Sequence, residues 1–580
     1  MAEEIDQNRI VDEIVAEANL PRDLLLPEEI DYLRERALHK PLRVVHIWSL
    51  GVGAVITGMY FGWNYGLPAG GPIGMLIASL IVCVLYLTWV LGLSELSVAM
   101  PFAGGPLAYG RRAVGKGFGF LMGWSMFLEC LFAAIGTALA TGGYVAILIN
   151  PDHPDSVVKT ACAIACALLF FAVQYRGVKG QAVVMLWLTY AAIAALVWFW
   201  LACIPGVARE RLITAPLLTG GWSGVLGAVP YALWWLVIIE SVALAAEEAH
   251  EPHVTIPRGM VWAQITLVIF VVLTWFFAVG AAPYAETGKD EVIYPLPQVF
   301  KAVWGKGWFL SAFSVLALSG LVVSYNGMIY ATSRQSFSLG RAGYLPAALG
   351  KVHSTYRTPH ISLAVWTVVT IGFVIFGHFN EKAANAAILI STLTAVLWYV
   401  AAMICLFVLR WKEPHMARPY KVPIYPVMPS FIALLSLFAA YLYGGLNVQI
   451  LLPTGVLYAA AALWYWVWAR KMVLPFAPEE VAARIAQELA RRQGGLADQV
   501  PAPCPASPAY LWLERITGLG LVLGLVSVSW ILLGAKGVLP VARSESAEVL
   551  GTIIVWSALF ILVSLVGLLS TRKSVERTHR

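Results

Sequence analysis

Apolar positions form long runs along this chain, separated by short polar stretches. A helix needs about 20 mostly apolar residues to cross the roughly 30 Å hydrocarbon core of a bilayer. Twelve runs reach that length before residue 471, and two more follow in the C-terminal part. The pattern predicts an all-α integral membrane protein with transmembrane helices at about 44–67, 72–99, 118–149, 157–175, 181–205, 224–247, 259–282, 308–337, 361–378, 384–409, 424–446 and 448–469, then 514–534 and 549–570.

Composition agrees with the pattern and narrows the chemistry. Hydrophobic residues make up 59% of the chain and charged residues 12%, against about 25% charged in soluble domains. The net charge of +6 comes from basic residues in short loops, which points to membrane topology and not to nucleic-acid binding. The seven cysteines show no metal-binding spacing. No metal, cofactor or disulfide framework is expected.

The basic loops also predict an orientation. Clusters such as Arg111–Arg112, Arg334–Arg341 and Arg410–Lys412 fall on one side if the apolar runs alternate. The positive-inside rule then places both termini in the cytoplasm. Two cytoplasmic pieces are predicted outside the runs: a helical N-terminal segment at 1–43, and an amphipathic helix with a Pro-rich linker at 471–512.

Two acidic residues lie deep inside apolar runs. Glu240 is the only charged residue between Leu212 and Ala246, and Glu129 lies within the run 118–149. A charged side chain at the centre of a bilayer costs about 2.5–3.5 kcal/mol on insertion scales. Each carboxyl group is therefore a candidate cation or proton site, while a hydrogen-bonded structural role stays open for both. Glu248 is expected at a cytoplasmic exit, where it would attract cations or be solvated.

The first run contains Gly51, Gly53, Gly58, Gly62 and Gly66. Glycine weakens a helix by about 1 kcal/mol relative to alanine, so the backbone around 55–58 could unwind and offer free peptide groups to a ligand. Close helix packing through small residues is an equally good interpretation. The sixth run has no glycine near Glu240, and its composition predicts no clear break.

Four motifs, VGAVITGMYFGWNYGL, LSELSVAMPFAGGPLAYGRRAVG, WWLVIIESVALAAEEAHEPHVTIPRG and YNGMIYATSRQSFSLGRAGYLP, resemble the amino acid–polyamine–organocation superfamily of transporters and, within it, bacterial ethanolamine permeases. The resemblance implies a leucine-transporter-type fold with two inverted five-helix repeats that work by alternating access. It divides the chain into repeats at 44–205 and 206–410 and accessory helices at 411–470. The last helices and tail, at 513–580, lie outside it.

The resemblance also assigns site residues. Ile56, Thr57 and Gly58 match the broken first helix that touches substrate, and Trp234 matches a gating aromatic of the sixth helix. Glu240 matches an acidic residue that binds an amine or couples to protons, with Ser241 beside it and Glu129 as a second candidate for both roles. Tyr325 and Met328 match the opposite wall, and Trp235 and Tyr60 are further gate candidates. Some proton-coupled relatives carry a Lys in the fifth helix, but the run 181–205 contains none.

The combined prediction is a multi-pass secondary transporter of a bacterial inner membrane that imports ethanolamine or a similar small primary amine through the lipid bilayer. A proton or another ion would couple to it, and the oligomeric state is left open. An amino-acid permease or exchanger is the alternative within the same superfamily, and a membrane amine sensor is the alternative of another class. No nucleophile–base cluster in the runs indicates an enzyme.

Overall fold

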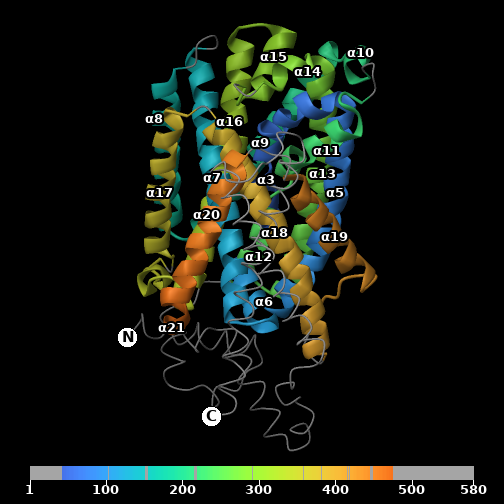
Figure 1. The fold of residues 1–580 in the computed structure, drawn as a ribbon. Coiled ribbons are helices and arrows are strands. Elements are labelled where there is room, and N and C mark those ends of the chain that lie inside the picture. Colours follow the sequence, from blue (N-terminus) through green and yellow to red (C-terminus); the bar gives the residue numbers. More distant parts are fainter. Residues whose placement is uncertain are drawn as a thin grey trace, which may run out of the picture.

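The computed structural model describes residues 42–473, apart from 102–103, 151–154, 214–217, 290–291, 357, 381, 415, 417 and 444–447. Within these residues the chain is helical, with one isolated backbone bridge between Leu42 and Ala249. The predicted N-terminal helical segment, the amphipathic helix after residue 473 and the two C-terminal spans lie outside the described residues. Figure 1 shows the helices as one upright bundle.

The first half of the bundle contains α3 (Val44–Val55), α4 (Thr57–Tyr60), η2 (Trp63–Gly66), α5 (Leu67–Ala99), α6 (Pro106–Ala113), α7 (Lys116–Ile149), α8 (Ser156–Tyr175), α9 (Val178–Cys203), η3 (Ile204–Gly206) and α10 (Arg209–Leu212). The second half contains α11 (Gly221–Ala232), η4 (Leu233–Trp235), α12 (Ser241–Leu244), η5 (Ala246–Glu248), α13 (Pro252–Ala281), α14 (Tyr284–Thr287), α15 (Pro295–Trp304), α16 (Trp308–Arg341), η6 (Ala347–Gly350), α17 (His360–His378), α18 (Ala383–Lys412), α19 (Val427–Leu442), α20 (Val448–Trp464), η8 (Tyr465–Ala469) and α21 (Arg470–Met472).

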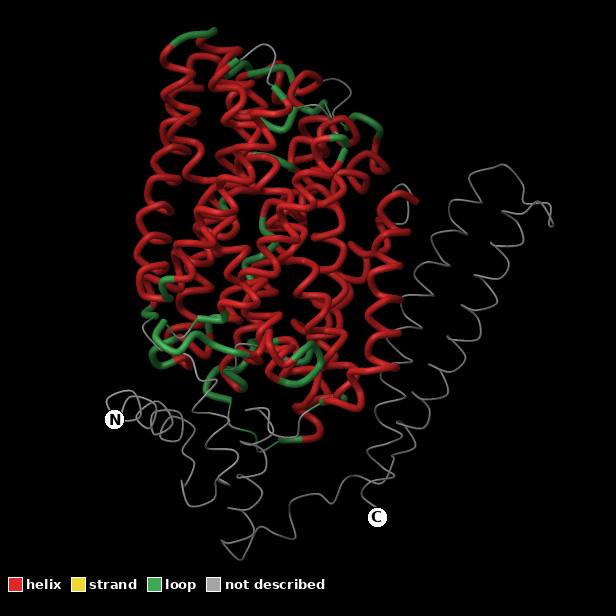
Figure 2. The backbone as a smooth tube through the Cα atoms, turned by 90° about the vertical axis from the view of Figure 1, so that its left-hand side faces the viewer, coloured by secondary structure: helices red, strands yellow, loops and turns green. Residues whose placement is uncertain are grey.

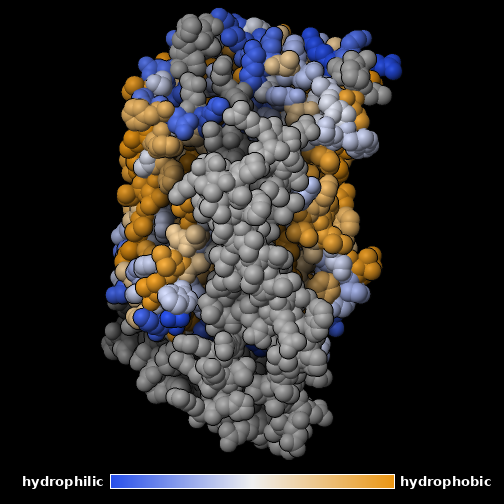
Figure 3. Space-filling model, in the orientation of Figure 1, coloured by the Kyte–Doolittle hydropathy of each residue, from blue (hydrophilic) through white to orange (hydrophobic). Residues whose placement is uncertain are grey.

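The prediction of an all-α membrane protein is confirmed. Each of the twelve apolar runs within the described range contains at least one helix, and nine helices there are long and apolar enough to cross a membrane. The helices run along one axis, and most loops gather at the two ends (Figure 2). On the coloured flanks of the face seen in Figure 3, hydrophobic side chains lie at mid-height and hydrophilic ones toward the two ends. This banding is what a bilayer requires of a surface in contact with lipid.

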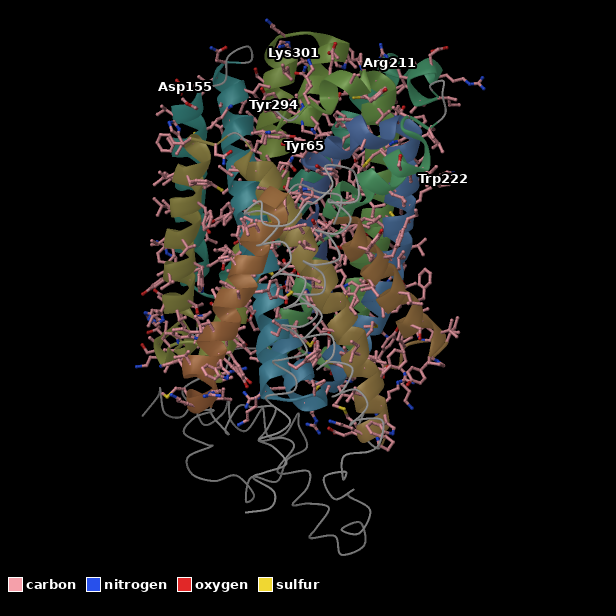
Figure 4. All side chains as sticks on the ribbon, viewed as in Figure 1. Tyr65, Asp155, Arg211, Trp222, Tyr294 and Lys301 are labelled. Atoms are coloured by element: carbon pink, nitrogen blue, oxygen red, sulfur yellow. The ribbon has the colours of Figure 1, made fainter. Side chains whose placement is uncertain are left out.

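The two ends of the bundle differ. The short helices α10, α14 and α15 cover one end, and α6 and α21 lie at the other (Figure 1). We call these the α15 end and the α6 end. Asp155, Arg211 and Lys301 lie at the α15 end (Figure 4). There Asp155 caps α8 by accepting hydrogen bonds from two backbone N–H groups, which satisfies donors that a helix start leaves without partners.

Candidate functional site

The first apolar run is interrupted where the sequence predicts it. Helix α3 ends at Val55 and α4 begins at Thr57, with Ile56 between them. In an unbroken helix the Thr57 N–H would donate to the Gly53 carbonyl, four residues earlier. Instead, the Ser324 hydroxyl from α16 stands between these groups: it accepts from Thr57 N at 3.0 Å and donates to Gly53 O at 2.6 Å. A side chain inserted into the backbone ladder thus holds the helix open.

The sixth apolar run has a longer break, which its composition does not reveal. Regular helix stops at Trp235 and resumes only at Ser241. Within the break Ile238 has a φ of +77°, which a β-branched residue adopts only under tertiary constraint. The sequence offers one weak signal, because three successive β-branched residues, Val237 to Ile239, disfavour helix. Glu240 lies at the end of this break, directly before α12.

The two breaks pack against each other through glycines. A Cβ atom at Gly58 would lie 2.5 Å from the backbone oxygen of Trp234, and one at Gly62 would lie 2.3 Å from the Trp234 ring. Gly62 also has a φ of +92°. Phe61 meets the Trp234 ring edge-on, with centroids 5.5 Å apart. Glycine is required at both positions because any side chain would separate the two interrupted segments.

Glu240 is fully buried beside the sixth break. Its Oε1 atom accepts hydrogen bonds from the Tyr399 hydroxyl and, at 3.2 Å, from the Ile238 backbone N–H. Its Oε2 atom has no hydrogen-bond partner among the described residues. The carboxyl group is therefore held in place by one oxygen while the other stays available.

Glu129, on α7, has the same arrangement. It is fully buried, its Oε2 accepts from the Trp398 indole N–H at 2.6 Å, and its Oε1 has no partner in the described part of the chain. The Glu129 and Glu240 carboxyl groups lie close enough to act on each other electrostatically. The structure thus brings together the two acidic residues that the sequence singled out separately.

Two consecutive residues of α18, Trp398 and Tyr399, anchor this carboxyl pair. The Tyr399 ring stacks on Trp89 of α5 with centroids 4.1 Å apart, and its hydroxyl lies 3.0 Å from that of Tyr86. Sequence analysis did not identify these aromatic residues, because a Trp or Tyr in an apolar run has the same pattern whether it faces lipid or a carboxylate.

Further polar atoms near the breaks are buried without partners in the described structure: Thr57 Oγ1, Ser241 Oγ and Trp234 Nε1. A buried polar group without a hydrogen bond costs about 1–3 kcal/mol, and native proteins retain few of them. These three atoms lie on the two interrupted segments, and together with the two free carboxyl oxygens they offer partners to a polar ligand. No group of metal-ligating side chains occurs in the described ranges.

Four predicted site residues have other contacts in the structure. The Tyr60 hydroxyl donates to Ala192 O at 2.7 Å, and Met328 accepts from Thr137 at 3.2 Å. Tyr325 lies toward α8, with its ring 6.2 Å from Phe170. Trp235 donates to Ser79 Oγ at 2.9 Å and stacks on Trp63 with centroids 4.8 Å apart. These contacts connect the four side chains to neighbouring helices and not to the carboxyl pair.

The α6 end is held by buried ion pairs. Glu248 accepts from Arg334 Nε at 3.0 Å and from the Tyr330 hydroxyl at 2.6 Å, and both charged side chains are at most 2% exposed. The expectation that Glu248 is solvated or attracts cations is therefore wrong, since the structure engages it in this buried cluster. We call Glu248, Tyr330 and Arg334 the clasp. Nearby, Glu95 pairs with Arg410 and Arg418, and Arg112 pairs with Glu413.

For the transporter that the sequence predicts, Ser324→Ala is expected to reduce transport while leaving the fold intact. Without the hydroxyl, the Thr57 N–H can donate directly to Gly53 O, as in an unbroken helix. The net loss of folding free energy therefore stays within about 1.5 kcal/mol. The straightened helix displaces the neighbouring ligand groups, and we expect apparent substrate affinity to fall about tenfold, or about 1.4 kcal/mol. Ser319→Ala is the matched control, because Ser319 on the same helix only donates to Leu316 O. Equal effects on KM in uptake assays would contradict the role of Ser324.

Trp234→Ala and Trp235→Ala are expected to differ in kind. The Trp234 ring lies at the breaks, where it meets Phe61 edge-on, so its loss should weaken binding of the predicted cationic substrate by about 0.5–2 kcal/mol, as for a cation–π contact. Trp235 is packed and hydrogen-bonded, so its loss should lower the free energy of unfolding by about 3–5 kcal/mol with little change in KM. Uptake kinetics and thermal unfolding distinguish the two, and identical profiles would contradict the assignment.

Comparison with known proteins adds an independent observation. A protein-family model described as amino acid permease matches residues 43–474. An uncharacterized transporter of Rhizobium meliloti (strain 1021) is 28% identical over 75% of this chain and 93% of its own length. The branched-chain amino acid permease BcaP of Bacillus subtilis (strain 168) is 24% identical over 70% of this chain and 88% of its own. The lysine-specific permease LysP of Lactococcus lactis is 23% identical over 77% and 92%, respectively.

Proposed function

Because the chain belongs to the amino acid permease family, and is thus a membrane transporter and not an enzyme, we propose that it carries ethanolamine or a similar small primary amine by alternating access. The carboxyl pair supports this substrate. A primary ammonium has three N–H donors and one positive charge, and Glu129 Oε1 and Glu240 Oε2 are two buried acceptors without partners in the described structure. An ammonium that leaves water needs this kind of anionic partner.

A hydroxyl on the substrate has partners nearby. Thr57 Oγ1 and Ser241 Oγ are without partners in the described structure, and both belong to the interrupted segments next to the carboxyl pair. Trp234 offers an indole N–H and an aromatic face at the same place. These groups suit a short amino alcohol, which combines a cation with a hydroxyl.

An amino-acid substrate is the second candidate, and the names of BcaP and LysP favour it. An amino acid also brings a carboxylate, which needs N–H donors or a cation. In this structure the Thr57 N–H at the first break already donates to Ser324, and the two fully buried acidic residues of the site, Glu129 and Glu240, would repel a carboxylate. This arrangement favours an amine without a carboxylate.

The membrane context is part of the proposal. We place the protein in a bacterial inner membrane with the α6 end and both termini in the cytoplasm, following its basic loops. We further propose the division into five-helix units at 44–205 and 206–410. In this division the two interrupted segments are the first of each unit, as expected for a transporter built from inverted repeats.

Uptake of labelled ethanolamine into proteoliposomes tests the substrate. We expect saturable uptake that unlabelled ethanolamine suppresses and that leucine or lysine suppresses far less. Uptake of leucine or lysine that ethanolamine does not inhibit at any concentration would contradict the amine assignment and support the amino-acid alternative. Binding of ethanolamine without flux would instead indicate a sensor.

A further inference from the structure

The Glu129–Glu240 pair has no cation to balance it among the described groups that act on it. The ionisable side chains that interact with the pair are Tyr399 of α18, Tyr86 of α5, Cys130 of α7 and Tyr458 of α20. Tyrosine and cysteine side chains are ordinarily neutral at pH 7. The described residues around the pair therefore supply hydrogen bonds but no positive charge.

Two adjacent carboxylates cannot both stay ionised in such a place. Like charges in a low-dielectric interior repel strongly, and a shared proton is the usual resolution. The hydrogen-bond pattern indicates which carboxyl oxygens share that proton. Glu240 Oε1 and Glu129 Oε2 already accept from Tyr399 and Trp398. The remaining two oxygens have no donor from the described residues, and the two carboxyl groups act on each other electrostatically. A proton held by one of these oxygens lets it donate a hydrogen bond to the other, which gives both of them a partner.

We propose that the empty transporter keeps one proton between Glu129 and Glu240, and that the ammonium group of the substrate displaces it. This inference rests on the proposed function of the same site. Before binding, one carboxylic acid donates to one carboxylate. After binding, two carboxylates accept N–H bonds from one ammonium, and the proton has left for water. Each amine carried in one direction is thus exchanged for a proton carried in the other, with no net movement of charge.

The site favours exchange of the amine for a proton over symport of the two, because both bind to the same atoms. The ammonium brings a donor and a positive charge, which are the two properties that the proton supplied. Both cannot occupy the same two free oxygens. Uptake of amine is therefore expected to slow when the interior is more alkaline than the exterior, because the returning proton is then scarce.

Calorimetry of ethanolamine binding to the full-length protein in detergent tests the displacement. Titrations at one pH in buffers with different ionisation enthalpies give the number of protons released per amine bound. Linkage predicts about one proton per amine for the wild type. In Glu129→Gln the amide N–H₂ donates to Glu240 in place of the shared proton, so release should fall to less than half of the wild-type value. Glu413→Gln is the control, because Glu413 pairs with Arg112 at the α6 end, and its release should equal the wild type.

The outcomes separate this inference from the proposed function. If ethanolamine does not bind the wild type, the substrate assignment fails. If it binds and is transported but releases no proton, or if Glu129→Gln releases as many protons as the wild type, the exchange mechanism fails and the substrate stands. A pH-sensitive dye inside proteoliposomes provides the flux measurement, with protein-free liposomes subtracted for passive amine entry. We expect the lumen to become alkaline with uptake, and acidification would overturn the proposal.

Discussion

Glu240→Gln is expected to abolish amine transport while the protein still inserts and folds. The amide keeps the shape of the side chain and can still accept from Tyr399 and the Ile238 N–H, but it carries no charge for an ammonium. Losing one partner of a buried charge pair costs about 2–5 kcal/mol in binding, which is about 30-fold or more in affinity. Uptake of labelled ethanolamine across a range of pH values measures the effect.

Glu286→Gln is the matched control for this substitution. Glu286 is an exposed carboxylate in α14 at the α15 end, and its neutralisation should leave uptake unchanged. Size-exclusion behaviour and the thermal unfolding midpoint of both variants should match the wild type. Wild-type uptake by Glu240→Gln at every pH would remove this carboxyl group from the mechanism.

Arg334→Gln is expected to have the second large effect, through the clasp. It leaves the Glu248 carboxylate, which is fully buried, without its guanidinium partner. Removal of one member of a buried ion pair typically costs about 3–5 kcal/mol, because the remaining charge stays out of water. The expected result is a protein that unfolds at lower temperature and whose α6 end no longer closes, so that proteoliposomes leak substrate.

The structure offers a contrasting pair at the same end. Arg112 and Glu413 are 20% and 32% exposed, and exposed pairs contribute only about 0.2–1 kcal/mol. Arg112→Gln should therefore shift the unfolding midpoint far less than Arg334→Gln. A comparable shift would mean that burial of the clasp does not decide its strength.

Much of the architecture could be predicted from hydropathy alone. The twelve apolar runs are helical because a chain in lipid must satisfy its own backbone, and only helices do so within one segment. Glu240 and Glu129 were evident as candidates because a charge stands out in such runs. The break near Ile56 was suggested by the density of glycine around it.

What escaped prediction depends on tertiary contacts. The segment that leads into the break at Ile238 packs against Gly58 and Gly62 through Trp234 and Trp235, and the β-branched residues Val237 to Ile239 are only a weak local signal for the break. Ser324 resembles the many serines that bond within their own helix, and only the position of α3 shows that it reaches another one. Spacing along a sequence cannot distinguish Trp235, which packs on Trp63, from Trp234, which faces the breaks.

The backbone bridge at Leu42 links the start of the first segment to the clasp. Leu42 N donates to Glu248 O at 3.1 Å, and His250 N donates to Leu42 O at 2.8 Å. A displacement of the chain just before α3 would therefore also move Glu248, which binds Arg334. The chain at Leu42 is thus joined to the residue that binds Arg334, so that shortening or tethering the sequence before Leu42 should alter transport rate without altering which molecules are carried.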